Sequence, residues 1–266
     1  MSGTAIKLFL RTRFEASVRI MKSLYWSILN LGYRWSLFSV YDIPIVVNNF
    51  NRITYPLQLI NFLEKNGFNN IIILDNNSTY PPLLSYYETC PHRVVRERQN
   101  YGHLALWKSK LFRKIKWNYF VYTDSDVVPI EQCPEDFIQY FHQVLCKNYS
   151  LDKVGFGIKI DDLPDTFALK SKVIEYESRY WLREVTPGVY DAPIDTTFAL
   201  YKPLSSLKLG EAYTLRAFRF GFPYLIHHNP WYIDSMNLSE EEMYYIQTCN
   251  NSSSLGMQIK GKGNVY

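Results

Sequence analysis

Short apolar segments alternate with helical patterns through the first half of the chain, and this alternation most limits the possible folds. The apolar segments are residues 43–47, 71–74, 94–95 and 117–123. The helical patterns between them are residues 54–65, 81–88 and 103–115. Strands that are apolar throughout and separated by helices are typical of a parallel sheet covered by helices on both faces. We therefore predict an α/β fold with a mostly parallel central sheet.

The second half has a less regular pattern. It predicts two helices, at 135–146 and 168–184, and three strands, at 154–160, 195–201 and 222–228. Neither an internal repeat nor a linker is visible between residues 41 and 250. We therefore expect one domain at 41–266, with a first half at about 41–130 and a second half at 131–266.

Residues 5–38 form an amphipathic basic pattern. Positions at alternating spacings of four and three are apolar except for Ser17; they are Leu10, Phe14, Ser17, Met21, Leu24, Ile28 and Leu31. Residues 1–40 hold six basic side chains and one acidic one, 6 − 1 = +5, while the whole chain is +4. Such a helix favours either peripheral contact with anionic lipid, or packing on the domain or on a second copy in a homo-oligomer. Its charged residues argue against a membrane span.

The remainder of the chain is near neutral, 4 − 5 = −1, which disfavours a nucleic-acid partner. The cysteines, Cys90, Cys133, Cys146 and Cys249, lack metal-binding spacing. The first ten residues lack the pattern of a signal peptide. We expect a cytoplasmic protein with reduced thiols, peripheral on the inner face of the cell membrane if the basic helix binds lipid.

Two carboxylates follow the fourth predicted strand, in the sequence Asp124-Ser125-Asp126. Residues i and i+2 of an extended chain share a side, so both acids can face one site at the end of the strand. Ligands bind beyond these strand ends in open α/β sheets. Oxygen ligands suit Mg²⁺ or Mn²⁺. The alternative is a polar loop whose acids cap a helix.

The chain resembles the GT-A glycosyltransferases over about residues 43–235. The resemblance is carried by PIVVNNFNR, LDNNST, RQNYGH, VYTDSD and HHNPWY, in that order. The region from DDLPD to HHNPWY is also similar to bacterial transferases of capsule and lipopolysaccharide synthesis. The resemblance implies a GT-A, Rossmann-like fold, a divalent metal, and a nucleotide-sugar donor, with a UDP-sugar favoured.

The resemblance also implies roles for individual residues. The nucleoside would contact Val46, Asn48, Arg52 and, through uracil, Asp75; the ribose and diphosphate would lie near Asn100, Gly102 and His103. Asp124 would contact the ribose and, through water, the metal, which Asp126 and His228 would bind directly. Other interpretations are a pairing role for Arg52, a helix start at His103 and a surface turn at His227-His228.

The implied reaction transfers a sugar to a saccharide or lipid-linked acceptor. Inversion of the anomeric centre is favoured over retention and requires a base. Asp195 is the candidate, with Asp161, Asp162 and Glu211 as rivals. Tyr176, Tyr180 and Trp181 either stack on the acceptor or belong to the core.

Three other functions compete with this interpretation. A glycoside hydrolase needs carboxylates farther apart than an i, i+2 pair. A sugar nucleotidyltransferase typically begins with a glycine-rich phosphate loop, where this chain has NNFNRITYP. An inactive sugar-binding module would tolerate neutralisation of Asp126.

Overall fold

The computed structural model describes residues 3–205 and 215–249. The chain divides into two compact units, residues 1–40 and 41–266. In the first unit, helix α1 (Gly3–Arg34) ends four residues before the predicted end. Ser36 adopts a positive φ of 57°, and the N–H of Leu37 donates to the carbonyl of Gly32. Among the helices of the described residues, none has the length and hydropathy of a membrane span.

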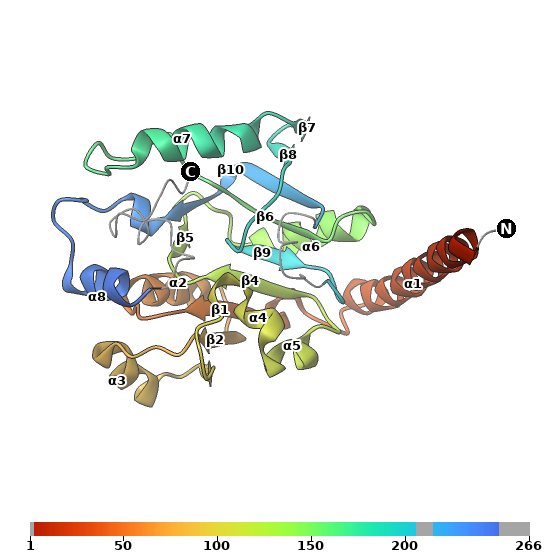
Figure 1. Cartoon of the computed structure of the whole chain (residues 1–266), viewed down its shortest axis with the longest axis horizontal. Helices are drawn as coiled ribbons and strands as arrows, with labels where there is room; N and C mark the ends of the chain where they lie inside the picture. Colours follow the sequence, from red (N-terminus) through yellow and green to blue (C-terminus); the bar gives the residue numbers. More distant parts are fainter. Residues whose placement is uncertain (1–2, 206–214, 250–266) are drawn as a thin grey trace. The chain divides into compact units, whose positions relative to one another are not determined.

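A single sheet forms the centre of the second unit (Figure 1). Its strands are β1 (Ile45–Asn49), β2 (Ile71–Asp75), β3 (Arg93–Arg96), β4 (Phe120–Asp124), β5 (Val127–Pro129), β6 (Lys153–Ile158), β7 (Glu184–Thr186), β8 (Val189–Asp191), β9 (Ala199–Tyr201) and β10 (Ala217–His228). The order is β3-β2-β1-β4-β9-β6-β10-β8-β7, with β5 also paired to β10. Strands β3, β2, β1 and β4 are parallel, as are β6 and β10, and β9 runs antiparallel between β4 and β6.

Helices cover both faces of this sheet, which confirms the predicted α/β class. The helices are α2 (Thr54–Lys65), α3 (Pro81–Thr89), α4 (Ala105–Lys108), α5 (Lys110–Ile115), α6 (Phe137–Lys147), α7 (Lys170–Ser178) and α8 (Glu240–Thr248). Helices α4 and α5 pack on the face of Phe120 and Tyr122. The strand residues between these two positions point to the opposite face of the sheet. On that side α2 and α6 meet through Phe62 and Phe137, whose ring centroids lie 6.0 Å apart.

Two predicted helices are interrupted. The helix expected at 103–115 is a 3-10 turn (Gly102–Leu104), then α4, then α5, because Ser109 leaves the helical conformation and its Oγ accepts from the N–H of Leu111. The helix expected at 168–184 ends at Ser178, and Glu184 instead begins the hairpin of β7 and β8. The strand expected from residue 195 begins at Ala199. Strand β5, the β7–β8 hairpin and α8 were not predicted.

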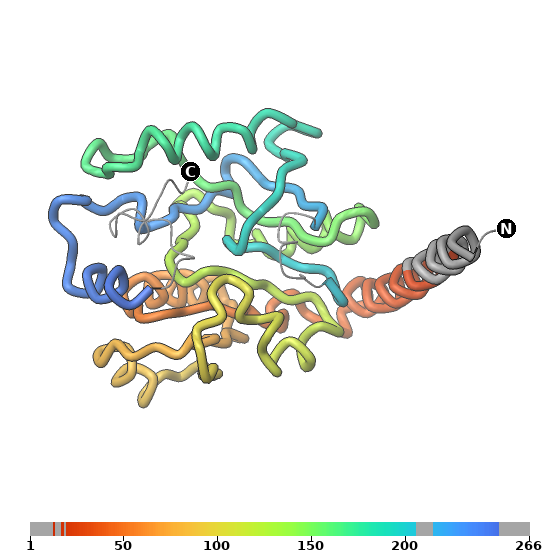
Figure 2. The backbone as a smooth tube through the Cα atoms, in the orientation of Figure 1, coloured from red at the N-terminus to blue at the C-terminus, as the bar shows by residue number. Residues whose placement is uncertain are grey.

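After β10 the chain forms α8, which packs against the start of α2 (Figure 2). Glu241 of α8 accepts hydrogen bonds from the N–H groups of Ile53 and Thr54, at 2.9 and 3.1 Å, and from the Thr54 hydroxyl at 2.7 Å. The first N–H groups of a helix lack partners within it and attract negative charge. A carboxylate from the far end of the sequence therefore caps α2.

Candidate active site

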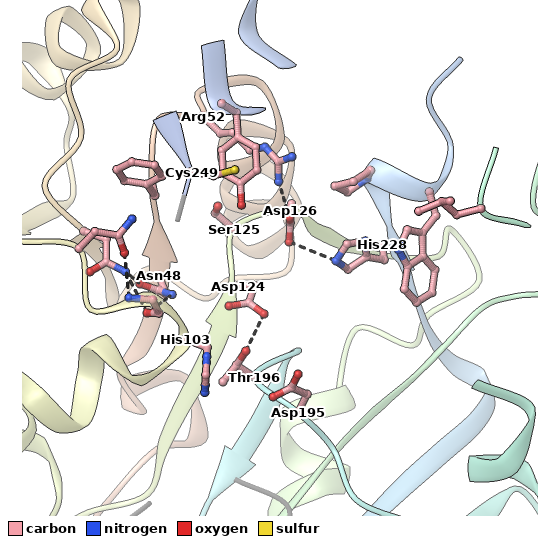
Figure 3. Close-up of a pocket in the computed structure, with 18 of the residues that line it drawn as sticks. Asn48, Arg52, His103, Asp124, Ser125, Asp126, Asp195, Thr196, His228 and Cys249 are labelled. Carbon is pink, nitrogen blue, oxygen red and sulfur yellow. Dashed lines mark hydrogen bonds and ion pairs between the residues drawn. The ribbon is translucent and has the colours of Figure 1, made fainter. Parts of the chain in front are cut away.

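An open cavity lies at the carboxyl ends of β1, β2 and β4 (Figure 3). Its lining includes most of the predicted site residues, namely Asn48, Arg52, Asn100, Gly102, His103, Asp124, Asp126, Asp195 and His228. They meet because parallel strands present their carboxyl ends at the same edge of a sheet. The loop before β9 and the end of β10 add residues from the second half of the chain.

Asp124 is the last residue of β4, and its side chain faces the cavity. Its Oδ2 accepts a hydrogen bond from the Thr196 hydroxyl at 2.7 Å. Burial, together with the negative charges of Asp126 and Asp195, raises the pKa of Asp124 to about 7, against the hydrogen bonds that lower it. Clustered carboxylates with a raised pKa are a mark of a functional site, because their charge is costly until something positive binds.

Asp126 lies in the turn between β4 and β5, opposite the end of β10. Antiparallel pairing of β5 with β10 sets Val127 beside His228, and the N–H of Asn229 donates to the Asp126 carbonyl at 2.8 Å. His228 Nε2 consequently lies 3.7 Å from Asp126 Oδ1. That Oδ1 is buried and accepts no hydrogen bond. Burial lowers the pKa of His228, which favours the neutral imidazole that metals bind.

Asp126 and His228 are the predicted direct metal ligands, and Asp124 is predicted to contact the metal through water. Within the ranges that the structure describes, no three His, Cys, Asp or Glu side chains converge as a metal site. Asp126 and His228 lie 3.7 Å apart, and Asp124 lines the same cavity with its Oδ2 accepting from Thr196. The orphaned Oδ1 of Asp126 and the neutral imidazole nevertheless fit a Mg²⁺ or Mn²⁺ ion that takes its remaining ligands from water and a bound diphosphate.

Arg52 lines the cavity, but its guanidinium is engaged by two carboxylates. Its Nη1 donates to Asp126 Oδ2, and its Nη2 donates to Glu242 Oε2 at 3.0 Å. The guanidinium carbon lies 3.7 Å from the centroid of the Tyr245 ring. The alternative interpretation of Arg52, a pairing role, is closer to the structure, but its partners are Asp126 and a helix that was not predicted.

Val46 and Asp75 do not line the cavity, and their predicted contacts with the nucleoside are wrong for this structure. Val46 is fully buried in the core beneath α4, three residues before the end of β1. Asp75 is 0% exposed and accepts from the Ser78 N–H, the Tyr87 hydroxyl and Arg96 Nε. Its carboxylate is thus enclosed by the first half of the chain and has no surface for a base.

A network of amides holds residues 100–103 over the strand ends. Asn76 Nδ2 donates to the Gly102 carbonyl at 2.9 Å, and the Tyr101 N–H donates to Asn76 Oδ1 at 2.8 Å. Asn48 Nδ2 donates to the same Gly102 carbonyl at 3.3 Å. Gly102 has a φ of +63°, a conformation that glycine adopts without strain. The network fixes His103 at the cavity wall.

Asp195 is exposed in the loop before β9 and lines the cavity from the second half of the chain. Lys153 lies beneath this loop, fully buried, and donates to the carbonyls of Ile194 and Asp195 and to the Tyr201 hydroxyl. Burial lowers the pKa of Lys153 to about 7, against the nearby charge of Asp195. The lysine ties the Asp195 loop to the sheet.

Other candidates lie away from the cavity. Asp161 pairs with Lys159, and Asp162 accepts from the Tyr232 hydroxyl at 2.6 Å. Glu211 lies outside the described residues. Tyr176, Tyr180 and Trp181 are absent from the lining, as the core interpretation predicts.

Sequence reasoning missed the aromatic residues of the cavity. These are Phe50, Phe167, Trp231 and Tyr245. Phe50 and Trp231 stand in motifs that the sequence pointed to, PIVVNNFNR and HHNPWY, but neither ring was assigned a role. Tyr245 lies on the unpredicted α8, so no local signal marked it.

No protein-family model matches the chain, and no curated protein does. Among solved structures, S. aureus TarS 1-349 is similar with 15% identity and a TM-score of 0.40, over 70% of this chain and 59% of that one. GalNAc-T7 with UDP, GalNAc and Mn²⁺ has 11% identity and a TM-score of 0.45, over 84% of this chain and 52% of that one. A cytidylyltransferase from Leptospira borgpetersenii has 9% identity and a TM-score of 0.41, over 85% of this chain and 99% of that one.

The chain thus spans little more than half the length of the first two of these structures. Similarity at these identities and TM-scores does not identify a reaction, so the function is derived below from the side chains of the cavity. TarS and GalNAc-T7 are glycosyltransferases, the family that the sequence resembles.

Proposed function

We propose that the chain is a metal-dependent glycosyltransferase, which moves a sugar from a nucleotide-diphosphate sugar to a saccharide or lipid-linked acceptor. The observation that carries the proposal is the meeting of Asp124, Asp126 and His228 with Asp195 in one cavity at the strand ends. The cavity combines clustered carboxylates with polar amides and aromatic rings.

The donor binds on the side of β1 and the loop 100–103. Asn48, Asn100 and His103 offer hydrogen bonds to a nucleoside and its ribose, and the Gly102 backbone allows close approach. A UDP-sugar is the favoured donor from the sequence resemblance. Because Asp75 is enclosed, recognition of the base falls to other groups at this end of the cavity.

The diphosphate leaves with increased negative charge, and the carboxylates alone would repel it. Asp126 and His228 would hold a divalent cation, with Asp124 contacting it through water. When bound, that cation stabilises the charge of the leaving diphosphate. Asp126 Oδ1 and the neutral His228 are suited to this task because neither is engaged by a hydrogen-bond donor at those atoms.

The acceptor enters from the second half of the chain, past Phe167 and Trp231. In the favoured inverting reaction, Asp195 removes the proton from the attacking acceptor hydroxyl. In a retaining reaction Asp195 would position the donor sugar. Its exposed carboxylate suits either role, and Lys153 holds the backbone that carries it.

Peripheral binding to anionic lipid is a further part of the proposal and concerns the first unit alone. Helix α1 is continuous over 32 residues and carries the apolar positions at spacings of three and four. The net charge of +5 over residues 1–40 would attract an anionic membrane surface. This would bring a lipid-linked acceptor to the enzyme in the synthesis of surface polysaccharide, on the cytoplasmic face of the membrane.

A thermal-shift screen of nucleotides and nucleotide sugars, with and without Mn²⁺, tests the proposal. At a ligand concentration of about 100 Kd, binding adds about 2.7 kcal/mol to stability, which raises the Tm by roughly 5 to 10 °C in a domain of this size. Asp126→Ala should lose the Mn²⁺-dependent shift with UDP while it keeps the native circular-dichroism spectrum. Asp161→Ala is the matched control, because Asp161 is an acid outside the cavity.

The products distinguish the competing functions. A glycosyltransferase releases UDP from a UDP-sugar, whereas a sugar nucleotidyltransferase releases pyrophosphate from a nucleoside triphosphate and a sugar phosphate. An inactive binding module would show the shift without release of either product. A shift that is unchanged in Asp126→Ala would refute the proposed metal site.

A further inference from the structure

We infer that Glu242 of α8 is a positioning residue for the proposed metal site, and that it acts on Asp126 through Arg52. The inference rests on the proposed function, since it concerns the same cavity. Nothing in the local sequence around Asp126 points to this residue, which lies 190 positions from Arg52 along the chain.

Arg52 is held from three directions. Its side chain is 3% exposed, and that of Glu242 is 4% exposed, so this ion pair is shielded from water. One Nη group donates to Asp126 and the other donates to Glu242, 3.0 Å away. The Tyr245 ring stacks on the guanidinium at 3.7 Å. A guanidinium held by two hydrogen-bonded carboxylates and an aromatic ring has little freedom to rotate.

This arrangement determines how Asp126 presents its carboxylate. Arg52 takes Oδ2, which leaves Oδ1 directed towards His228 and without a hydrogen-bond donor. Groups in the second layer of a metal site orient the ligands in this way. Arg52 thereby selects which oxygen of Asp126 is available to a cation.

Glu242 also offsets the positive charge of Arg52. Arg52 paired with Asp126 alone would sum to zero and would present a positive group to an incoming cation. With Glu242 included, the buried triad of one guanidinium and two carboxylates sums to −1. The negative charge of Asp126 therefore remains effective towards a divalent ion. Helix α8 contributes this charge to the site as well as capping α2 through Glu241.

The test measures Mn²⁺ binding in the presence of UDP, by the electron paramagnetic resonance signal of free Mn²⁺, in the full chain. Glu242→Gln should weaken Mn²⁺ binding by about 10- to 100-fold, the usual loss for a group that orients a ligand. In the background of Arg52→Met, the same change should alter the affinity by less than about threefold, because the intermediary is absent.

Glu241→Gln is the matched control, one position along the same helix. It removes the cap of α2 without touching Arg52, so it should lower the Tm and leave the Mn²⁺ affinity within about threefold of wild type. Glu242→Asp, which keeps the charge on a shorter side chain, provides the second variant if Glu242→Gln does not fold, and it should weaken Mn²⁺ binding by a smaller factor.

The outcomes separate the two proposals. If wild-type protein with UDP does not bind Mn²⁺, the proposed metal dependence fails, and this inference fails with it. If wild type binds Mn²⁺ but Glu242→Gln binds equally well, only the inference is overturned. It is also overturned if Glu241→Gln loses as much affinity as Glu242→Gln, since the effect would then come from the docking of α8.

Discussion

Asp124→Asn should make the metal-free protein more stable above neutral pH while it removes a group from the proposed active site. The pKa of Asp124 is raised from 3.8 to about 7, first by burial and then by the charges of Asp126 and Asp195. The folded state therefore binds more protons than the unfolded state between these values. Stability is lost as the pH rises through this window, and the loss is complete above the folded-state pKa.

The size of the destabilisation follows from the difference between the unfolded-state and folded-state pKa values of Asp124. A shift of about 3 units, at 1.36 kcal/mol per unit, corresponds to about 4 kcal/mol of destabilisation when Asp124 is fully ionised. Between about pH 5 and about pH 8, the wild type should lose about 2 to 3 kcal/mol relative to Asp124→Asn. An asparagine oxygen can still accept from the Thr196 hydroxyl, so that hydrogen bond does not offset the gain.

Urea unfolding in the presence of a chelator measures this difference at both pH values. Added Mn²⁺ and UDP should stabilise the wild type at the higher pH and leave Asp124→Asn much less affected. Asp161→Asn, an exposed acid outside the cavity, is the control for loss of one negative charge. If wild type and Asp124→Asn gave parallel curves of stability against pH, the reasoning about clustered carboxylates would be refuted.

Two further predictions concern the Asp195 loop and the N-terminal helix. Lys153→Met removes the donor to the carbonyls of Ile194 and Asp195 and should misplace Asp195. Turnover, measured by steady-state kinetics, should fall about 10- to 100-fold, while the Kd for UDP, measured by calorimetry, stays unchanged. An equal loss of turnover and of UDP affinity would contradict this. Deletion of residues 1–38 should release the protein from vesicles of anionic lipid in a flotation assay, and unchanged partitioning would rule out the lipid-binding helix.

The cavity was largely predictable where it depends on the ends of parallel strands. Asn48 and Asp124 follow apolar runs, and the sheet necessarily brings such positions together. Val46 was misjudged because it lies two residues further into β1, where α4 covers it. Asp75 was misjudged because Tyr87 and Arg96, from the neighbouring helix and strand, enclose its carboxylate.

The role of Arg52 could not be predicted from local sequence. Its partner Glu242 lies on a helix whose pattern is weak, since α8 places both Glu241 and Glu242 in buried positions. A pattern of buried acids does not resemble an amphipathic helix, so periodicity gave no signal. The three residues of β5 were also too few to predict, although the whole relation of Asp126 to His228 depends on them.

The pairing of β5 with β10 has a consequence for how such a protein can diversify. Main-chain hydrogen bonds, rather than side chains, set Val127 opposite His228, so the spacing of the acid and the imidazole is independent of the intervening sequence. Insertions and deletions in the loops between β5 and β10 can therefore change the shape of the cavity without separating Asp126 from His228.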